Sequence, residues 1–290
     1  GFLNNNILLN SSWYQNRSSN QLGARPLATT TGFNGLTGNF DATVENTGIE
    51  IDLHTKNIQN KNFNWKTTFN LSIPRNKLVK YDGLENSADV NRYRIGKPLT
   101  EIPLYHALGV NPETGFYEFE DYNNDGIINS NDKQWFEDLA PKFYGGLGNI
   151  LTYKSLSLEI FFQFKKQKDR NYLNVTSTAG LNRNARVDLY NRWQEAGDIA
   201  SIQKAGFNNP NQNESSSAIS DASFVRLRNI SLNYKVPKTV NLGIDINLYV
   251  QGQNLLTITN FKGRGADPEQ SGSSTLPPLQ QITLGVQLGF

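Results

Sequence analysis

The sequence contains no cysteine and no methionine. Without cysteine the chain has no disulfide framework, no thiolate metal site and no cysteine nucleophile. Because translation starts with methionine, its absence at position 1 indicates a processed product or a piece of a longer protein. No signal peptide is visible either, as expected if the natural N-terminus is missing.

Strong net charge and long apolar runs are also lacking. The chain has 28 Lys and Arg against 26 Asp and Glu, a net charge of +2, and no local basic run. We therefore expect no binding to nucleic acid. No apolar run approaches the length of about 18 residues that a transmembrane helix requires, which excludes such helices. A membrane β-barrel remains compatible with this composition, because half of each barrel strand is polar.

What the sequence does contain is strict alternation, clearest over residues 280–290. Every second residue is apolar, and the residues between them are small or polar. A period of two over about eleven residues is typical of a tilted transmembrane β-strand. An open strand edge in hydrocarbon leaves backbone groups unsatisfied, so we predict that this stretch is the barrel-closing and assembly strand. Its apolar positions are Ile282, Leu284, Val286, Leu288 and Phe290.

Similar alternation occurs in the stretches 6–16, 47–56, 63–73, 143–153, 156–165, 223–235 and 242–251. Together with the last stretch they predict an all-β fold, a transmembrane antiparallel β-barrel segment of about eight strands. The phase of alternation changes midway through 223–235, which predicts a β-bulge or an exit from the membrane there. Lys154 and Ser155 are expected to form a two-residue turn.

The predicted connections alternate in length. Those near Asn60, Lys154 and Lys238 are short, whereas long loops are expected at about 17–40, 74–141, 167–219 and 253–279. This sorting is typical of outer-membrane barrels, whose short turns are periplasmic and whose long loops are extracellular. A short amphipathic helix is expected at 184–195. Aromatic residues near the short turns predict an interfacial girdle, namely Phe63, Trp65, Tyr153, Tyr234 and Phe290.

One long loop contains a spacing that suits Ca²⁺. Hard oxygen donors stand at positions 1, 3, 5, 9 and 12 of residues 121–132, the backbone carbonyl of Ile127 supplies position 7, and Gly126 allows the sharp turn. The side-chain donors are Asp121, Asn123, Asp125, Asn129 and Asp132. The alternative is an Asn/Asp-Gly turn on a solvated loop. We predict a structural calcium ion in this extracellular loop.

Two further motifs have simpler explanations. Gly145, Gly146 and Gly148 resemble a phosphate-binding loop, but no helix follows them, so a strand loosened by glycine is favoured. His54 and His106 are the only histidines. His54 alternates with apolar residues and is expected to face the lumen, and neither histidine has a Ser/Asp setting that suggests catalysis. No catalytic site is predicted, and we expect that the protein is not an enzyme.

Several stretches resemble SusC/RagA-type TonB-dependent outer-membrane transporters. The first is 220–234, SDASFVRLRNISLNY, and others are 249–257 (YVQGQNLLT), 267–269 (DPE), 45–50 (ENTGIE), 143–149 (FYGGLGN) and 276–290. The resemblance covers essentially the whole chain, with 263–266 slightly longer than the family pattern. It implies the C-terminal part of a barrel of about 22 strands, whose lumen is filled by a plug domain outside this chain.

The resemblance also implies partners. These are a SusD-like surface lipoprotein, the remainder of the barrel and its plug, the TonB complex through the missing N-terminal part, the barrel-assembly machinery and the lipid bilayer. The leading hypothesis is TonB-dependent uptake of oligosaccharides, glycan fragments or peptides across the outer membrane of a Gram-negative bacterium. The alternative is a structural subunit of an outer-membrane assembly or secretion complex. An outer-membrane hydrolase is disfavoured. The sequence does not identify the substrate or the residues that contact it.

Overall fold

The computed structural model describes residues 1–26, 29–33, 35–87, 89–171, 187–206, 209–237, 243–262, 267–270 and 276–289. The fold is all-β, and in these ranges the helical segments are short 3₁₀ helices. None of the helical segments in these ranges has the length and apolar character that crossing a membrane requires.

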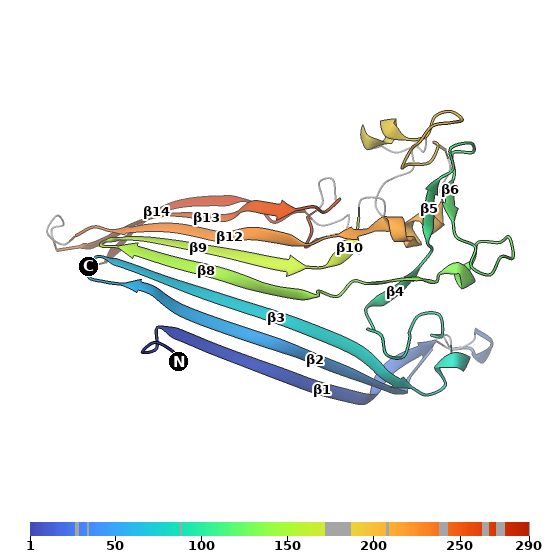
Figure 1. Ribbon diagram of the computed structural model, residues 1–290, viewed down its shortest axis with the longest axis horizontal. Helices are drawn as coiled ribbons and strands as arrows, with labels where there is room; N and C mark the ends of the chain where they lie inside the picture. Colours follow the sequence, from blue (N-terminus) through green and yellow to red (C-terminus); the bar gives the residue numbers. More distant parts are fainter. Residues whose placement is uncertain are drawn as a thin grey trace.

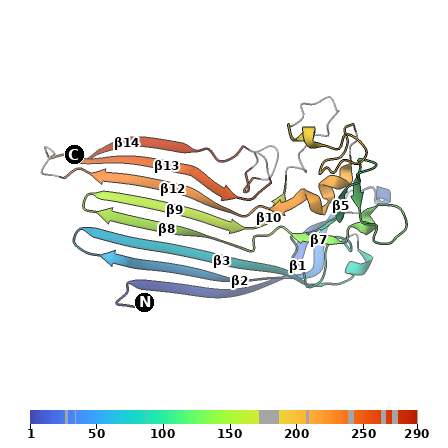
Figure 2. The same cartoon turned by 45° about the horizontal axis from the view of Figure 1, so that its top comes forward.

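Eight strands form one antiparallel sheet in which each strand lies beside its predecessor (Figures 1 and 2). They are β1 (Ile7–Pro26), β2 (Gly35–Gln59), β3 (Phe63–Tyr81), β8 (Phe143–Tyr153), β9 (Leu156–Lys166), β12 (Phe224–Lys235), β13 (Asp245–Thr259) and β14 (Gln281–Gly289). The predicted number of strands and their antiparallel order are confirmed. Among the described residues, β1 pairs only with β2 and β14 only with β13, so each has one open edge.

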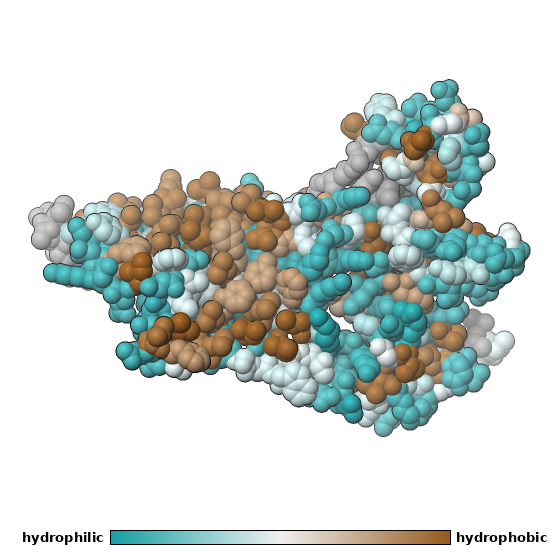
Figure 3. All heavy atoms as spheres, viewed as in Figure 1, coloured by the Kyte–Doolittle hydropathy of each residue, from teal (hydrophilic) through white to brown (hydrophobic). Residues whose placement is uncertain are grey.

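The alternation separates an apolar face of this sheet from a polar face. Consecutive register partners on the apolar face are Leu284, Val250, Leu232, Leu158, Leu151, Trp65 and Ile58. One position along, the partners on the polar face are Thr283, Gln251, Ser231, Glu159, Ile150, Lys66 and Lys56. Because side chains in a strand alternate between faces, the period of two in the sequence becomes two chemically different surfaces. Figure 3 shows hydrophobic atoms gathered in a band across the strands.

Aromatic residues line up near the short turns. Tyr234 pairs with Leu156, Leu156 with Tyr153, and Tyr153 with Phe63, all on the apolar face. Tyr153 is 53% exposed and Tyr234 is 40% exposed. The girdle residues of three hairpins therefore occupy one level of the sheet, whereas Phe290, the fifth predicted member, lies outside the described residues.

The first two long loops begin later than predicted. Residues 17–26 and 35–40 belong to β1 and β2, so most of the expected loop at 17–40 is strand. Polar side chains such as Arg17, Ser18 and Ser19 hide this part of the strand, because hydrophobic periodicity detects a strand only where one face is apolar. Similarly, β3 continues through Pro74 to Tyr81. Its pairing with β8 ends at Ser72, and a proline is tolerated where one side of a strand is unpaired.

The bulge and the tight turn follow the sequence closely. In β12 the register shifts between Leu227 and Asn229 against both neighbouring strands, which confirms the predicted change of phase. Lys154 adopts the left-handed conformation with φ 52°, as the first residue of a two-residue hairpin turn often does. The fourth loop starts later than 253, because β13 continues to Thr259.

The long loops contain structure of their own at one end of the sheet (Figures 1 and 2). Three two-stranded sheets pair β4 (Glu101–Leu104) with β7 (Trp135–Asp138), β5 (Ala107–Val110) with β6 (Tyr117–Phe119), and β10 (Lys168–Arg170) with β11 (Ile219–Asp221). The 3₁₀ helices there are η1 (Thr29–Thr31), η2 (Leu84–Asn86), η3 (Ser130–Asp132), η5 (Val187–Asn191), η6 (Pro210–Glu214) and η7 (Ser216–Ala218).

The expected helix at 184–195 was wrong in its described part. Only residues 187–191 form a helix, the 3₁₀ helix η5, and residues before 187 lie outside the described ranges. Leu189 is 4% exposed, whereas Val187 and Tyr190 are 77% and 75% exposed. The apolar residues therefore do not share one buried face, and the helical spacing was accidental.

The three glycines of β8 allow close packing inside the sheet. A Cβ atom on Gly145 would lie 2.1 Å from the carbonyl oxygen of Asn70, and one on Gly146 would lie 2.7 Å from the ring of Phe161. Gly148 is similarly close to Thr68. These residues form part of a strand with no helix after them, so the simpler reading of the glycine motif is confirmed.

Candidate functional site

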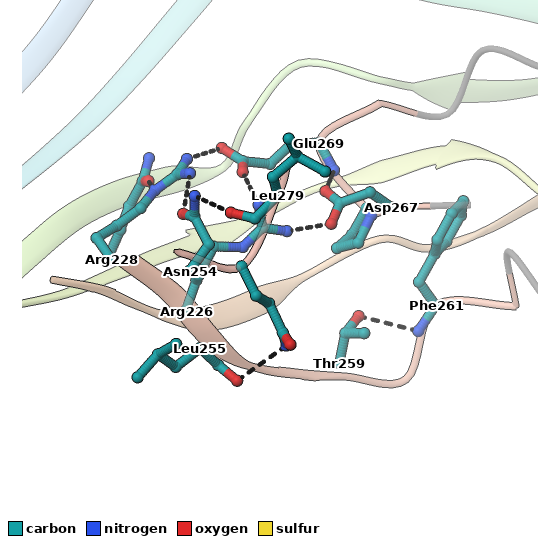
Figure 4. Close-up of polar contacts among 12 residues, drawn as sticks. Arg226, Arg228, Asn254, Leu255, Thr259, Phe261, Asp267, Glu269 and Leu279 are labelled. Atoms are coloured by element: carbon teal, nitrogen blue, oxygen red, sulfur yellow. Dashed lines mark hydrogen bonds and ion pairs between the residues drawn. The ribbon is translucent and has the colours of Figure 1, made fainter. Parts of the chain in front are cut away.

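Two arginines at the β12 bulge reach a turn that lies about forty residues further along the chain (Figure 4). Opposite the bulge, Asn254 of β13 has a positive φ of 52°, and the ladder resumes at Asn229. Arg226 precedes this register shift and Arg228 lies within it, and both side chains reach the same loop. Their partners are Asp267 and Glu269 in the loop between β13 and β14, and we call these four residues the arginine clasp.

The clasp pairs two cations with two anions around the buried side chain of Arg226. The Arg226 side chain is 1% exposed and forms ion pairs with Asp267 and, at 2.6 Å, with Glu269. Arg228 binds the other oxygen of Glu269 at 2.5 Å and donates from Nε to Gln163 of β9. Glu269 bridges the two arginines, because one of its carboxylate oxygens forms an ion pair with each guanidinium group.

Further hydrogen bonds hold the same loop against the sheet. Gln167, at the end of β9, donates from Nε2 to the Pro268 carbonyl at 2.8 Å. At the other end of the loop, Asn254 donates from Nδ2 to the Leu279 carbonyl at 3.1 Å (Figure 4). The described residues 267–270 and Leu279 of the loop between β13 and β14 are thus held against the sheet, and the clasp acts as the structural anchor of the 267–270 turn.

The first half of the predicted calcium loop folds tightly around its own N–H groups. Asp121 Oδ2 accepts the Gly126 N–H at 2.8 Å, and Gly126 has a φ of 77°. Asn123 Oδ1 accepts the Asp125 N–H at 3.2 Å, and Asp125 Oδ1 accepts the Ile127 N–H at 2.8 Å. Asp121 Oδ1 is buried and has no hydrogen-bond partner. The carboxylates are oriented by the backbone, and one buried oxygen remains unsatisfied.

The second half ends in a capping box. Asp132 is fully buried; its two oxygens accept the Tyr122 N–H at 3.0 Å and the Asn129 N–H at 2.8 Å. Asn129 in turn caps η3 by accepting the Asn131 N–H at 2.9 Å. Position 12 of the motif therefore joins the two ends of the loop, as a position-12 carboxylate must do to close a cation site.

The arrangement fits a cation in part. Hard oxygen donors, a sharp glycine turn and the orphaned Asp121 oxygen suit Ca²⁺. However, among the described residues no three His, Cys, Asp or Glu side chains gather closely enough to hold a metal ion. In this conformation N–H donors satisfy most of the carboxylate oxygens.

His106 has a setting that the sequence did not reveal. Its Nδ1 atom lies 2.7 Å from Glu120 Oε2, and its ring stacks on Trp135 at 4.5 Å between centroids. Glu120 follows β6 and Trp135 starts β7, so the contacts connect two of the small sheets of the loops. His54, on β2, pairs with Leu8 and Thr68 and takes a position on the polar face, as predicted.

Trp193 anchors a second group of loops. Its Nε1 donates to the Pro112 carbonyl at 2.7 Å, and its ring lies where a Cβ atom on Gly115 would be. Lys204 lies over this ring and over Phe116, 3.8 Å from the Phe116 centroid. The indole of Trp193 therefore makes a contact within the loops, which joins the β5–β6 hairpin to the segment 187–204.

Asp221 and Lys166 tie the short β10–β11 sheet to the end of β9. Lys166 Nζ lies 2.6 Å from Asp221 Oδ2. Burial alone would raise the pKa of Asp221, but hydrogen bonds from Lys166 and Ser223 outweigh it and lower the pKa to about 2. The Asp221 side chain is therefore ionised at neutral pH, and its hydrogen bonds with Lys166 and Ser223 stabilise the charged form.

The terminal strand β14 pairs with β13 up to Gly289. Ile282, Leu284, Val286 and Leu288 are on the apolar face, between 51% and 75% exposed. Phe290 lies outside the described residues. Sequence reasoning missed the clasp as a site, although both of its halves belong to stretches that suggested the family; the visible signal was an Arg-x-Arg pair at a change of strand phase.

Comparison with known proteins gives consistent relatives, although no family model matches the chain. The TonB-dependent receptor P3 of Formosa agariphila is 28% identical over 315 residues, which cover 98% of this chain and 31% of that protein. The TonB-dependent receptor SusC of Bacteroides thetaiotaomicron is 26% identical over 323 residues, covering 100% of this chain and 31% of SusC.

Solved structures agree in fold. A chain of the RagAB peptide transporter matches with a TM-score of 0.80 and 24% identity, over 99% of this chain and 34% of its own length. A chain of the RagAB peptide importer in its open-open state matches with a TM-score of 0.80 and 25% identity, over 99% and 33%. This chain spans about a third of the length of these relatives. It is related over nearly its whole length to the TonB-dependent receptors of the SusC/RagA type.

Proposed function

We propose that this chain forms part of an outer-membrane β-barrel that imports oligosaccharides, glycan fragments or peptides by TonB-dependent transport. The observation that carries the proposal is the register of the sheet, in which an apolar residue of one strand faces an apolar residue of the next across seven strands. Such a continuous apolar face suits lipid, and the opposite polar face suits a lumen. The relatives are named as TonB-dependent receptors, which supports uptake.

The proposal includes partners. The open edges of β1 and β14 would pair with the remainder of the barrel, because unpaired edges are untenable in hydrocarbon. A plug domain would fill the lumen, and the TonB complex would act through it. A SusD-like lipoprotein would cover the extracellular loops, and the barrel-assembly machinery would recognise the β14 edge by β-augmentation.

Import is tested by deleting the natural gene and following the depletion of peptide and oligosaccharide mixtures from the medium by mass spectrometry. We expect a defined subset to remain unconsumed in the deletion strain and in wild-type cells treated with an uncoupler. Consumption unchanged by the deletion, together with stable co-purification with secretion proteins, would contradict import and favour a structural subunit.

The membrane orientation has a direct test because the chain has no cysteine. A cysteine introduced at Asn191, in η5 of the long loops, should react with an impermeant maleimide on whole cells. A cysteine at Lys154, in the short turn between β8 and β9, should react only after permeabilisation. Labelling of both positions on intact cells would contradict the orientation.

We further propose that residues 121–132 bind Ca²⁺ as a structural ion, with the donors predicted from the sequence. The support is the spacing, the turn at Gly126 and the buried, unpartnered Oδ1 of Asp121. Ion binding would draw the carboxylates together and give this oxygen a partner.

The calcium site predicts protection from proteolysis. In Ca²⁺, Asp125→Ala should be cleaved within 74–141 at the rate of the wild type in EGTA, because one hard ligand is lost. Asn124→Gly, between two donors but outside the predicted set, should behave as the wild type does. An EGTA-insensitive wild-type digestion pattern would exclude the site.

A further inference from the structure

A basic cavity lies among the long loops, and Ser130, near the end of the 121–132 motif, forms part of its wall. Its volume is about 370 Å³, and its walls come from the segment after η2, from β4, η3, β10 and η6. We propose that it binds a carboxylate of an acidic peptide, which identifies a substrate class for the import function proposed above and rests on that function. A cavity of this size holds one side chain with part of its neighbour, at the low end of small-molecule sites.

Charge is the first argument. Of the described residues in the lining, three are basic, Arg92, Lys133 and Arg170, and one is acidic, Glu214, so two positive charges are in excess. Lys133 is already paired with Glu214. The excess therefore resides on the two arginines, whose planar forks bind carboxylates through paired N–H groups.

The arginines keep donors available. Arg170 uses Nη1 to donate to the Asn213 carbonyl at 2.5 Å, which fixes its fork at the wall. Arg92 lies 5.0 Å from the Tyr93 ring centroid and, within the described ranges, forms no ion pair with a carboxylate. One oriented fork and one unpaired fork at the same cavity are an incomplete ionic network that an anion would complete.

The remaining wall favours a peptide over a sugar. Its apolar part is aliphatic, Ile102, Pro103 and Leu104, and Leu104 is 1% exposed. Among the described residues that line the cavity there is no aromatic ring on which a sugar ring could stack. An acidic residue beside an aliphatic one would place its carboxylate on the arginines and its neighbour on this apolar wall.

The walls are held rigidly, as a binding site requires. The Tyr105 N–H, directly after β4, donates to the Glu214 carbonyl at 2.9 Å and joins β4 to η6. Lys133 lies 5.0 Å from the Tyr105 ring centroid, and Asp132 beside it closes the 121–132 loop. The cavity is thus built on fixed contacts between segments far apart in the sequence.

The test measures binding of dye-labelled peptides to the complete natural protein in detergent, by fluorescence anisotropy. The probe is a hexapeptide of alternating leucine and glutamate, and the matched probe carries glutamine in place of glutamate. Oligogalacturonate, an oligosaccharide that also carries carboxylates, is the third probe. We expect the glutamine peptide to bind about tenfold more weakly, as the loss of a charge-assisted hydrogen bond implies. The galacturonate should bind more weakly than the acidic peptide.

The variants are Arg92→Gln and Arg170→Gln, singly and together, with Lys61→Gln in the β2–β3 turn as the charge-matched control. Each arginine variant should weaken the acidic peptide about tenfold and leave the glutamine peptide unchanged, and the control should bind both as the wild type does. Lys133 is left intact because its replacement would leave Glu214 without its ion-pair partner. A wild-type heat-modifiability shift on gels would show that the variants are folded.

Equal affinity for the glutamate and glutamine peptides would overturn the proposal, as would wild-type affinity in the folded double variant. Tighter binding of galacturonate would overturn the peptide assignment. Import distinguishes this inference from the function on which it rests. If cells import both peptides equally well, the cavity assignment fails and the transporter stands; if they import no peptide or oligosaccharide by this protein, the transport function itself fails.

Discussion

Replacing Arg226 by methionine should release the turn 267–270 from the sheet. Methionine keeps much of the aliphatic volume but leaves Asp267 without its arginine and Glu269 with only Arg228. Removing one partner of a buried ion pair destabilises by about 3–5 kcal/mol, because the remaining charge is uncompensated. Asp267 and Glu269 are 10% and 20% exposed, so water relieves part of this penalty. We expect a loss of about 3 kcal/mol, at the lower end of that range.

Arg228→Met is the matched comparison. The Arg228 side chain is 27% exposed, and its loss leaves Glu269 still paired with the buried Arg226. The remaining lost contacts are hydrogen bonds to Gln163 and Asn254. A partly exposed interaction of this kind contributes about 1 kcal/mol. The two variants remove the same charge from the same strand, but they differ in the burial of the arginine and in the carboxylates left without a partner.

Hydrogen exchange measured by mass spectrometry separates the two. The Gln270 N–H donates to the Asp267 carbonyl at 2.9 Å, so its exchange reports opening of the turn. A loss of about 3 kcal/mol should speed this exchange about 100-fold in Arg226→Met, against less than tenfold in Arg228→Met. Peptides from β13 should be unchanged. Wild-type exchange in Arg226→Met, or equal acceleration in both variants, would refute the clasp as the anchor of this loop.

Three further outcomes are expected. Leu284→Asp, on the apolar face of β14, should reduce the amount of folded protein in the membrane, because a charge facing lipid costs on the order of 2 kcal/mol. Gln287→Asp, on the polar face, should reduce this amount only slightly. Equal yields of folded protein on heat-modifiability gels would show that the faces are misassigned. Gly285→Ala should lower stability by about 1 kcal/mol or more in urea titrations, because its Cβ would lie 2.2 Å from the Tyr249 ring; an unchanged midpoint would contradict this packing. The Asp221 pKa is lowered to about 2, so its stabilising contribution is complete above its ordinary value of 3.8 and is lost as pH falls towards 2. Amide protection of β11, corrected for intrinsic rates, should weaken across that window and lose this dependence in Asp221→Asn.

The sheet could be predicted well because its signal is local. Alternation with a period of two assigns each side chain to a face without knowledge of its partner strand, as Leu284 and Thr283 illustrate. The change of phase in 223–235 likewise revealed the bulge between Leu227 and Asn229. The same reasoning failed over residues 17–26, where polar side chains leave no hydrophobic period, and at Pro74, where the partner on one side is already absent.

By itself, then, the sequence determined the strands, their two faces, the short turns and the oxygen spacing of 121–132. Only the tertiary structure decided which distant residues meet: Arg226 with Asp267, His106 with Glu120, and Arg92 with Arg170 at one cavity. These pairings join different loops, and their energies depend on burial and on the removal of water, which a pattern along one segment does not encode. Strand pairing brings the long loops together at one end of the sheet, and contacts between the loops then create the sites.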